Sequence, residues 1–204
     1  MKVKAVGSFA LTRQKLKQLQ YPRPDDIASF IKESFQSAET LKAIIHVAKA
    51  FPDKKVYLKP KGVPQGQFKK LIDEHLSFGP NNIIQTQEDS YEILLKTNFC
   101  LSDPSTLVAE AAQFGLASYC LAFSSEWKSL YWRRFPGLCP ESAEEIISNI
   151  KAISNGTARY PIERYCDLIN LTGEIIWDTV LTDMGLKNVG TGPNKHLQFV
   201  HALP

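Results

Sequence analysis

Apolar and polar residues follow one another along the chain in blocks that predict strands and amphipathic helices. The clearest block runs from Asn98 to Leu121. It opens with an apolar run of strand length, continues through polar residues 102–106, and from Leu107 shows apolar side chains at helical spacing until Gly115. A second apolar run of strand length closes it. This succession predicts one βαβ unit whose parallel strands are buried on both faces.

Similar patterns predict the other elements of the chain. We expect strands at 3–9, 55–59 and 82–85 and a brief one at 136–140, and helices at 25–35, 37–51, 65–76, 88–96, 141–153 and 165–181. At least five strand-and-helix units therefore alternate. The fold class predicted is α/β, a Rossmann-like open parallel sheet with helices on both faces.

The polar break of the clearest block is the first candidate for chemistry. Asp103 before Pro104 reads as an N-cap followed by proline at the first helical position. The helix start offers backbone N–H groups, the Ser105 and Thr106 hydroxyls and the positive end of the dipole, which together favour an anion. Glu110, one turn deeper, is placed to accept hydrogen bonds from ribose hydroxyls. The alternative is a purely structural cap, and a charged Asp103 would repel phosphate.

Other candidates lie where predicted strands end. Gly7 and Ser8 close the first strand in a turn that a ligand's phosphate can approach. Lys59 and Lys61 follow a later strand, at the edge of a parallel sheet where ligands dock, and would pair with phosphate oxygens. Ser102 begins the polar break described above. Each lysine has an alternative role as a solvated loop charge.

An aromatic and basic segment follows the clearest block, at 124–134. Trp127 and Tyr131 are four residues apart and share a helix face. The rings could stack on a base, pack against a partner domain or fill the core of this domain.

Composition narrows the class of protein. A net charge of +3 and a pI near 8.6 are too small to indicate nucleic-acid binding. No apolar run approaches the roughly eighteen residues of a membrane span, and no N-terminal segment resembles a signal peptide. The four cysteines lack metal-ligand spacing, and two of them, Cys100 and Cys120, fall in predicted buried strands. A reduced, cytoplasmic protein without a metal is the expectation.

Two motifs carry a family resemblance over about residues 40–150. The first is S-x-x-S-T-L-V-A-E-A-A-x-x-G at 102–115, between two apolar strands, and the second is VYLKPKG at 56–62. Together they resemble the donor-binding segment of GT-B glycosyltransferases, in particular bacterial capsule sugar transferases and glycerophosphotransferases. Lys61 stands where those families often have histidine, and Gly62 where a second proline is common.

The resemblance implies one half of a GT-B fold. Residues 1–160 would form a nucleotide-sugar donor-binding domain, and 161–204 a C-terminal crossing helix with a loosely ordered tail. The donor would be a nucleotide-sugar or a CDP-alditol, used in surface polysaccharide or glycoconjugate biosynthesis. No cofactor and no metal is implied, because a helix dipole and cations can neutralise the leaving diphosphate. The partner implied is an N-terminal acceptor-binding domain or subunit, which also provides for peripheral membrane association and supplies any general base.

Two alternatives remain open at this point. A UDP-sugar 2-epimerase has a similar fold, although such enzymes usually carry additional carboxylates and histidines in the cleft. A non-catalytic interaction domain would keep the fold without the ligand, and Lys61 and Asp103 favour that reading.

Overall fold

One parallel sheet forms the centre of the molecule. The computed structural model describes residues 23–123, 133 and 137–160. In this part of the chain five strands lie in the order β3-β2-β1-β4-β5, and every neighbouring pair is parallel. The strands are β1 (Ile27–Ile31), β2 (Val56–Pro60), β3 (Ile83–Gln85), β4 (Phe99–Ser102) and β5 (Ala117–Cys120). The predicted open parallel sheet is confirmed.

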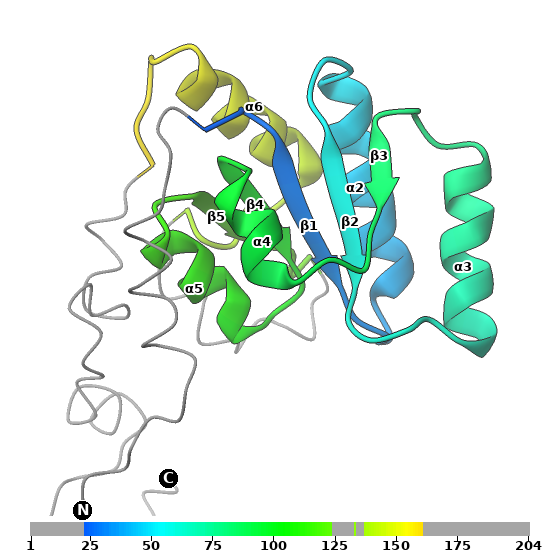
Figure 1. Ribbon diagram of the computed structural model, residues 1–204. Helices are drawn as coiled ribbons and strands as arrows, with labels where there is room; N and C mark the ends of the chain where they lie inside the picture. The colour runs from blue at the N-terminus through cyan, green and yellow to red at the C-terminus, as the bar shows by residue number, and fades with distance from the viewer. Residues whose placement is uncertain (1–22, 124–132, 134–136, 161–204) are drawn as a thin grey trace, which may run out of the picture.

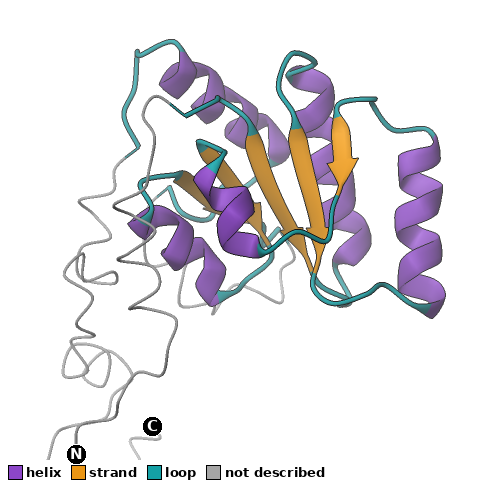
Figure 2. Ribbon diagram, in the orientation of Figure 1, coloured by secondary structure: helices purple, strands orange, loops and turns teal. Residues whose placement is uncertain are grey.

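Helices cover both faces of the sheet (Figures 1 and 2). They are α2 (Ser37–Ala50), α3 (Gly66–Ser77), α4 (Ser90–Leu95), α5 (Thr106–Gln113) and α6 (Ala143–Ser154). Helices α2, α3 and α6 pack on one face, while α4 and α5 pack on the other. The helices predicted at these five places are confirmed, each within a few residues at its ends.

Each strand sends alternate side chains to the two apolar layers, as its pleat requires. In β4, Phe99 and Leu101 pack towards α2 and α6, while Cys100 packs towards α5. All four residues of β4 are buried. At about 25 cal/mol per Å² of apolar surface, such side chains contribute roughly 1.5–3 kcal/mol each, so the central strands hold the layers together.

The central strand β1 corrects one sequence prediction. The helix expected at 25–35 is wrong, because Ile27–Ile31 is a strand with all five residues buried. Strand β1 is hydrogen-bonded to β2 on one side and to β4 on the other. A short apolar run has no periodicity that separates a buried strand from a buried helix, and only the pairing resolves it.

The brief strand expected at 136–140 is also wrong for its described residues. Residues 137–140 form a turn in which Gly137 has a φ of 86°, in the left-handed region that glycine tolerates. Leu138 in this turn is buried, and its carbonyl accepts a hydrogen bond from Cys120 N at 2.7 Å.

Several predictions fall on other parts of the chain. Three of them lie outside the described residues: the strand at 3–9 with Gly7 and Ser8, the rings of Trp127 and Tyr131, and the C-terminal region 161–204. Among the described residues, no helix is long and apolar enough to cross a membrane.

Candidate functional site

The candidate site lies at the carboxyl edge of the sheet, between β1 and β4. From β1 the chain crosses to β2 on one side, whereas from β4 it crosses to β5 on the other. Two neighbouring parallel strands whose connections leave in opposite directions make a topological switch point, where open α/β sheets bind ligands. The loop after β1 leads into α2, and the loop after β4 leads into α5 (Figure 1).

Asp103 joins the two loops at this switch point. Its carboxylate accepts hydrogen bonds from Lys32 N at 2.7 Å, from Thr40 Oγ1 at 2.8 Å and from Gln36 Nε2 at 3.2 Å. Gln36 Nε2 also donates to Leu121 O, at 3.0 Å, at the end of β5. These contacts, which we call the Asp103 network, fasten the loop after β1 to the ends of β4 and β5.

Burial sets the electrostatics of the Asp103 network. Asp103 is completely buried, and its burial raises the pKa of the carboxyl group above the usual range. The hydrogen bonds from Lys32 N–H, Thr40 and Gln36 and the charge of Lys32 lower that pKa, although by less than burial raises it. A carboxylate can accept all three hydrogen bonds, so the Asp103 side chain satisfies these donors and holds the loop after β1 in place.

The Asp103 network corrects the predicted helix start. Asp103 is not the N-cap, and Pro104 is not the first helical residue. The N-cap of α5 is Ser105, with φ −163° and ψ 161°, and its hydroxyl accepts a hydrogen bond from Leu107 N at 3.2 Å. Thr106 begins the helix and is exposed. The cap falls on Ser105 because the Asp103 side chain points away, to partners in the loop after β1 and in the first turn of α2.

The loop after β1 was missed by the sequence reasoning. Ser37 Oγ accepts a hydrogen bond from Ser34 N at 2.8 Å and lies 2.9 Å from Lys32 O, to which it donates, so the loop is folded tightly at the start of α2. Ser34 Oγ is buried without a hydrogen-bond partner among the described residues. The sequence did carry a signal for this loop. The pattern of the clearest block is repeated here, with the apolar run of β1, then polar Lys32-Glu33-Ser34, then a helix start at Ser37.

Glu110 lies on α5, one turn below Thr106. Its Oε2 accepts a hydrogen bond from Tyr91 Oη, on α4, at 2.7 Å. The Tyr91 ring in turn packs on Phe114, with 5.8 Å between the ring centroids. Glu110 is half-buried, so one carboxylate oxygen is held by the protein at the edge of the site.

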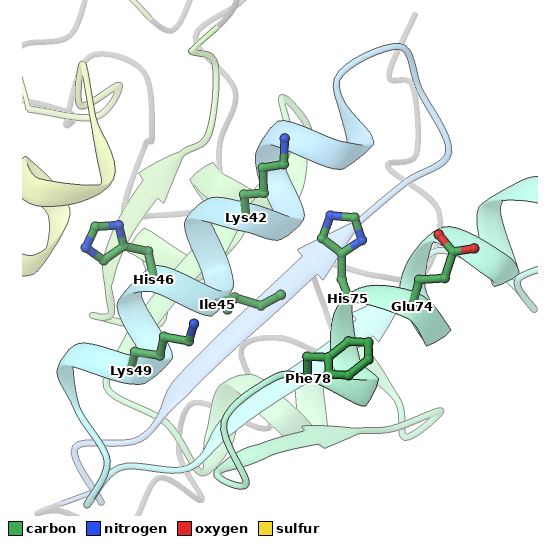
Figure 3. Close-up of a pocket in the computed structure, with 7 residues that line it drawn as sticks. All are labelled: Lys42, Ile45, His46, Lys49, Glu74, His75 and Phe78. Carbon is green, nitrogen blue, oxygen red and sulfur yellow. The ribbon is translucent and has the colours of Figure 1, made fainter.

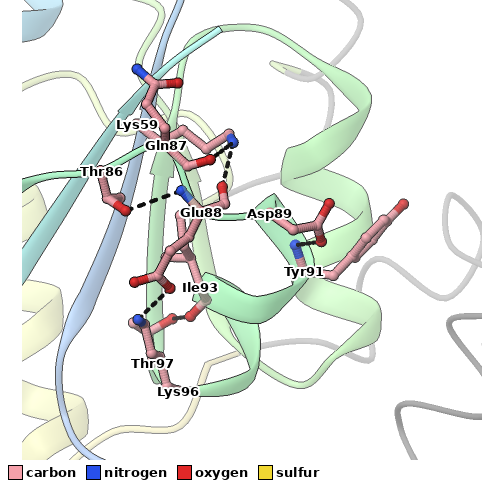
Figure 4. Close-up of polar contacts among 9 residues, drawn as sticks. All are labelled: Lys59, Thr86, Gln87, Glu88, Asp89, Tyr91, Ile93, Lys96 and Thr97. Carbon is pink, nitrogen blue, oxygen red and sulfur yellow. Dashed lines mark hydrogen bonds and ion pairs between the residues drawn. The ribbon is translucent and has the colours of Figure 1, made fainter. Parts of the chain in front are cut away.

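Lys59 and Lys61 separate at the end of β2. The Lys59 ammonium donates to Gln87 O at 3.4 Å and to Glu88 O (Figure 4). It therefore ties β2 to the turn before α4, whose helix is capped by Asp89 through a 2.9 Å bond from Tyr91 N. Lys61 is exposed, and its backbone N donates to Ile31 O at 2.8 Å, beside the loop after β1.

The structure brings some of the predicted site residues together and not others. Three of them lie together beside the switch point: Ser105 is the N-cap of α5, and Thr106 and Glu110 belong to its first two turns. Ser102 is buried, and its hydroxyl donates to Asp103 O at 2.9 Å, within the loop rather than towards solvent. Among the described residues, no group of three or more side chains of the metal-binding types is placed to hold an ion.

A groove also lies elsewhere, between α2 and α3. It has a volume of about 670 Å³ and is lined by Ile45 and Lys49 of α2, by His75 of α3 and by Phe78 directly after α3, among others (Figure 3). Both helices start at the carboxyl edge and run away from it, and the lining residues come from their later turns, apart from Lys42 in the second turn of α2. Most of the groove therefore lies away from the switch point, and its size alone does not make it the site.

Solved structures of other proteins share the fold of this chain. No protein family and no curated protein matches the chain. A putative UDP-N-acetylglucosamine 2-epimerase from Listeria monocytogenes is 13% identical with a TM-score of 0.52, over 88% of this chain and 53% of that one. An O-GlcNAc transferase mutant from Thermobaculum terrenum is 14% identical with a TM-score of 0.51, over 80% and 36%. A structure of the wall teichoic acid polymerase TagF with CDPG is 10% identical with a TM-score of 0.50, over 86% and 46%.

These likenesses concern the fold alone, because the identities are low. They confirm an α/β Rossmann-like fold of the kind found in GT-B-type proteins. The chain spans about half the length of the epimerase and of the teichoic acid polymerase.

Proposed function

We propose that this chain is the nucleotide-sugar-binding half of a two-domain GT-B-type transferase, with the donor's diphosphate at the switch point between β1 and β4. The observation that carries the proposal is the Asp103 network, which holds the starts of α2 and α5 side by side at the carboxyl edge. Two helix starts at the same edge of the sheet can offer N–H groups and positive dipole ends to one anion.

The phosphates would contact the loop after β1 and the start of α5. Thr106 contributes an exposed hydroxyl at the start of α5, and Ser34, in the loop after β1, would have to turn its buried hydroxyl, which has no partner among the described residues, outwards to reach a phosphate. Lys61, exposed at the end of β2 beside Ile31, supplies a cation. Lys59 would act differently from the sequence prediction, as a residue that positions the turn at 86–89 through the carbonyls of Gln87 and Glu88.

The nucleoside would lie along α5. Glu110 keeps one carboxylate oxygen on Tyr91, and the other is available for ribose hydroxyls. A carboxylate held in this way is pre-oriented, so less rotamer entropy is lost on binding. The turn at 86–89 would border the base.

The chemistry would need a partner. Departure of the nucleoside diphosphate would be stabilised by helix dipoles and Lys61, without a cofactor or metal. An N-terminal acceptor-binding domain or subunit would supply the acceptor and any general base, and could carry a peripheral membrane contact. Residues 1–160 are proposed as the donor domain and 161–204 as the crossing helix and tail, in a pathway of surface polysaccharide or glycoconjugate synthesis.

Calorimetric titration of the purified chain with UDP, CDP, GDP and CMP tests the proposal. At least one diphosphate should bind, and Glu110→Ala should weaken it by about tenfold or more, since hydrogen bonds to charged groups contribute roughly 1.5–3 kcal/mol. Glu74→Ala, on the exposed surface of α3, is the matched control and should not change affinity. Equal affinity in Glu110→Ala and the parent chain would contradict the ribose role, and no binding to any nucleotide would favour a non-catalytic domain.

A UDP-sugar 2-epimerase is the second candidate, favoured by the fold match to the Listeria protein. Asp103 is committed to three donors and Glu110 to Tyr91, which leaves neither suited to move a proton. Proton NMR of the chain, with its partner domain once identified, distinguishes the two: an epimerase interconverts the 2-epimers of the UDP-sugar without an acceptor, and a transferase does not.

A further inference from the structure

The described cysteines sit in three different environments. Cys100 and Cys120 are completely buried in β4 and β5, and Cys139 is half-buried in the turn that follows. Cys139 lies directly beside Cys120: both side chains belong to the apolar cluster formed with Val108 of α5, and Cys120 N donates to Leu138 O at 2.7 Å.

This contact places the two thiols within reach of one covalent bond. The carbonyl that Cys120 N binds belongs to the residue immediately before Cys139. Standard backbone dimensions then put the Cα atoms of Cys120 and Cys139 about 5–6.5 Å apart, inside the roughly 4.4–6.8 Å that disulfides span.

The surroundings of Cys139 also favour reaction. The neighbouring Cys120 thiol lowers the pKa of Cys139 through a hydrogen bond, and the Arg133 guanidinium lowers it further, against burial and Glu141. Arg133 is fixed near the turn by bonds to Ala122 O and to Glu141 Oε1, the latter at 3.1 Å. A thiolate is the nucleophilic form of cysteine, and a positive, partly exposed setting is where reactive cysteines occur.

The other two thiols differ. Burial raises the pKa of Cys100 to about 12, so it is the unreactive reference within the same protein. The hydrogen bond to Cys139 and burial raise the pKa of Cys120, which keeps it protonated as the donor to its neighbour.

We propose that Cys139 and Cys120 are an oxidative modification site, at which a peroxide converts the two thiols into a disulfide. The Cys139 thiolate attacks one oxygen of hydrogen peroxide, the O–O bond breaks, and the product is a sulfenic acid with hydroxide leaving. The Cys120 sulfur then attacks the Cys139 sulfur and displaces a second hydroxide. The Cys120 proton and the proton first lost by Cys139 turn the two hydroxides into water, so two thiols are oxidised while one peroxide is reduced to two waters.

The bond would form next to the switch point. Leu121 follows Cys120, its N donates to Ser102 O at 2.8 Å, and its carbonyl accepts from Gln36. Oxidation therefore ties residue 139 to the strand end that borders the Asp103 network, whatever ligand that site binds.

Peptide mapping of the full chain tests the proposal. After exposure to hydrogen peroxide, then alkylation and digestion with trypsin, the peptide Phe135–Lys151 should be linked to Thr97–Lys128. Because Thr97–Lys128 carries both Cys100 and Cys120, a second cleavage by chymotrypsin assigns the linkage to Cys120. Dithiothreitol should reverse it, and in the reduced chain Cys139 should alkylate about tenfold or more faster than Cys100, as its lower pKa requires.

Two variants complete the test. Cys139→Ser should abolish the linked peptide while circular dichroism shows an unchanged fold, and Cys120→Ser should leave Cys139 as a sulfenic acid, trapped by dimedone. A linkage from Cys139 to Cys100 or to Cys166 would overturn the proposal. So would the absence of any linked peptide, or alkylation of Cys139 no faster than that of Cys100.

Discussion

Asp103→Asn is the sharpest test of how the carboxyl edge is held together. Asparagine has the same shape, but one of its two terminal atoms becomes an NH2 group. Thr40 and Gln36 donate to Oδ1, and Lys32 N donates to Oδ2. In either orientation of the asparagine amide, its NH2 group therefore faces at least one of these donors and cannot accept its hydrogen bond. At least one charge-assisted bond worth about 1.5–3 kcal/mol is lost.

The loss is partly offset, because asparagine carries no charge into the interior. The raised pKa of Asp103 shows that burial penalises its anion. We therefore expect a net fall of about 1–2 kcal/mol in the free energy of unfolding at pH 7, or a few degrees in Tm for a chain of this size. Urea denaturation of the full chain, followed by circular dichroism, measures it.

The pH dependence supplies a second, independent readout. With a folded-state pKa above the unfolded value, the folded chain holds a proton that the unfolded chain releases in the window between the two pKa values. Lowering the pH through that window adds stability to the parent chain and not to Asp103→Asn. The stability difference should widen on acidification from pH 7 to pH 4. A variant as stable as the parent at pH 7 would refute the reasoning, and so would a stability difference that narrows on acidification.

Three further substitutions address the neighbouring contacts. Tyr91→Phe removes the hydroxyl that binds Glu110 and should lower the free energy of unfolding by about 0.5–1.5 kcal/mol in urea denaturation; no change would mean that the bond adds nothing. Ser105→Ala removes the cap of α5 and should cost about 0.5–2 kcal/mol by the same assay, whereas an unaffected helix would contradict Ser105 as the cap. Thr106→Ala should weaken nucleotide binding by about 1 kcal/mol, or roughly fivefold by calorimetry, and a loss of all binding would point to a larger role for this side chain.

The βαβ unit from 98 to 121 was predictable because every boundary carries a local signal. The polar break, the helical spacing and Gly115, which has a φ of 76° after α5, all lie within a few residues of what they determine. Strand β1 lacked such signals. Its five residues follow two aspartates that resemble a helix start, and its identity as the central strand depends on pairing with β4, far along the chain.

The role of Asp103 could not be read locally for a related reason. An aspartate before a proline and a helix is an ordinary N-cap, and nothing nearby in sequence argues otherwise. Its true partners are 63 to 71 residues away, so only the folded sheet brings them together. Lys59 shows the same limit, because its place at a strand end was predicted, while the carbonyls that hold its ammonium belong to a later turn.

The strand order has a consequence for the time course of folding. Lys32, at the end of β1, is separated from Asp103 by 71 residues. At a synthesis rate of about 5–20 residues per second, β1 leaves the ribosome roughly 4–14 s before the segment that pairs with its second edge. Strand β2 and helix α2 can fold against β1 in that interval, but the row of N–H and C=O groups on the side of β4 stays open. The nascent chain thus presents an uncharged strand edge, Ile27–Ile31, to other chains, and its yield in cells should depend on chaperones that cover this edge until β4 arrives.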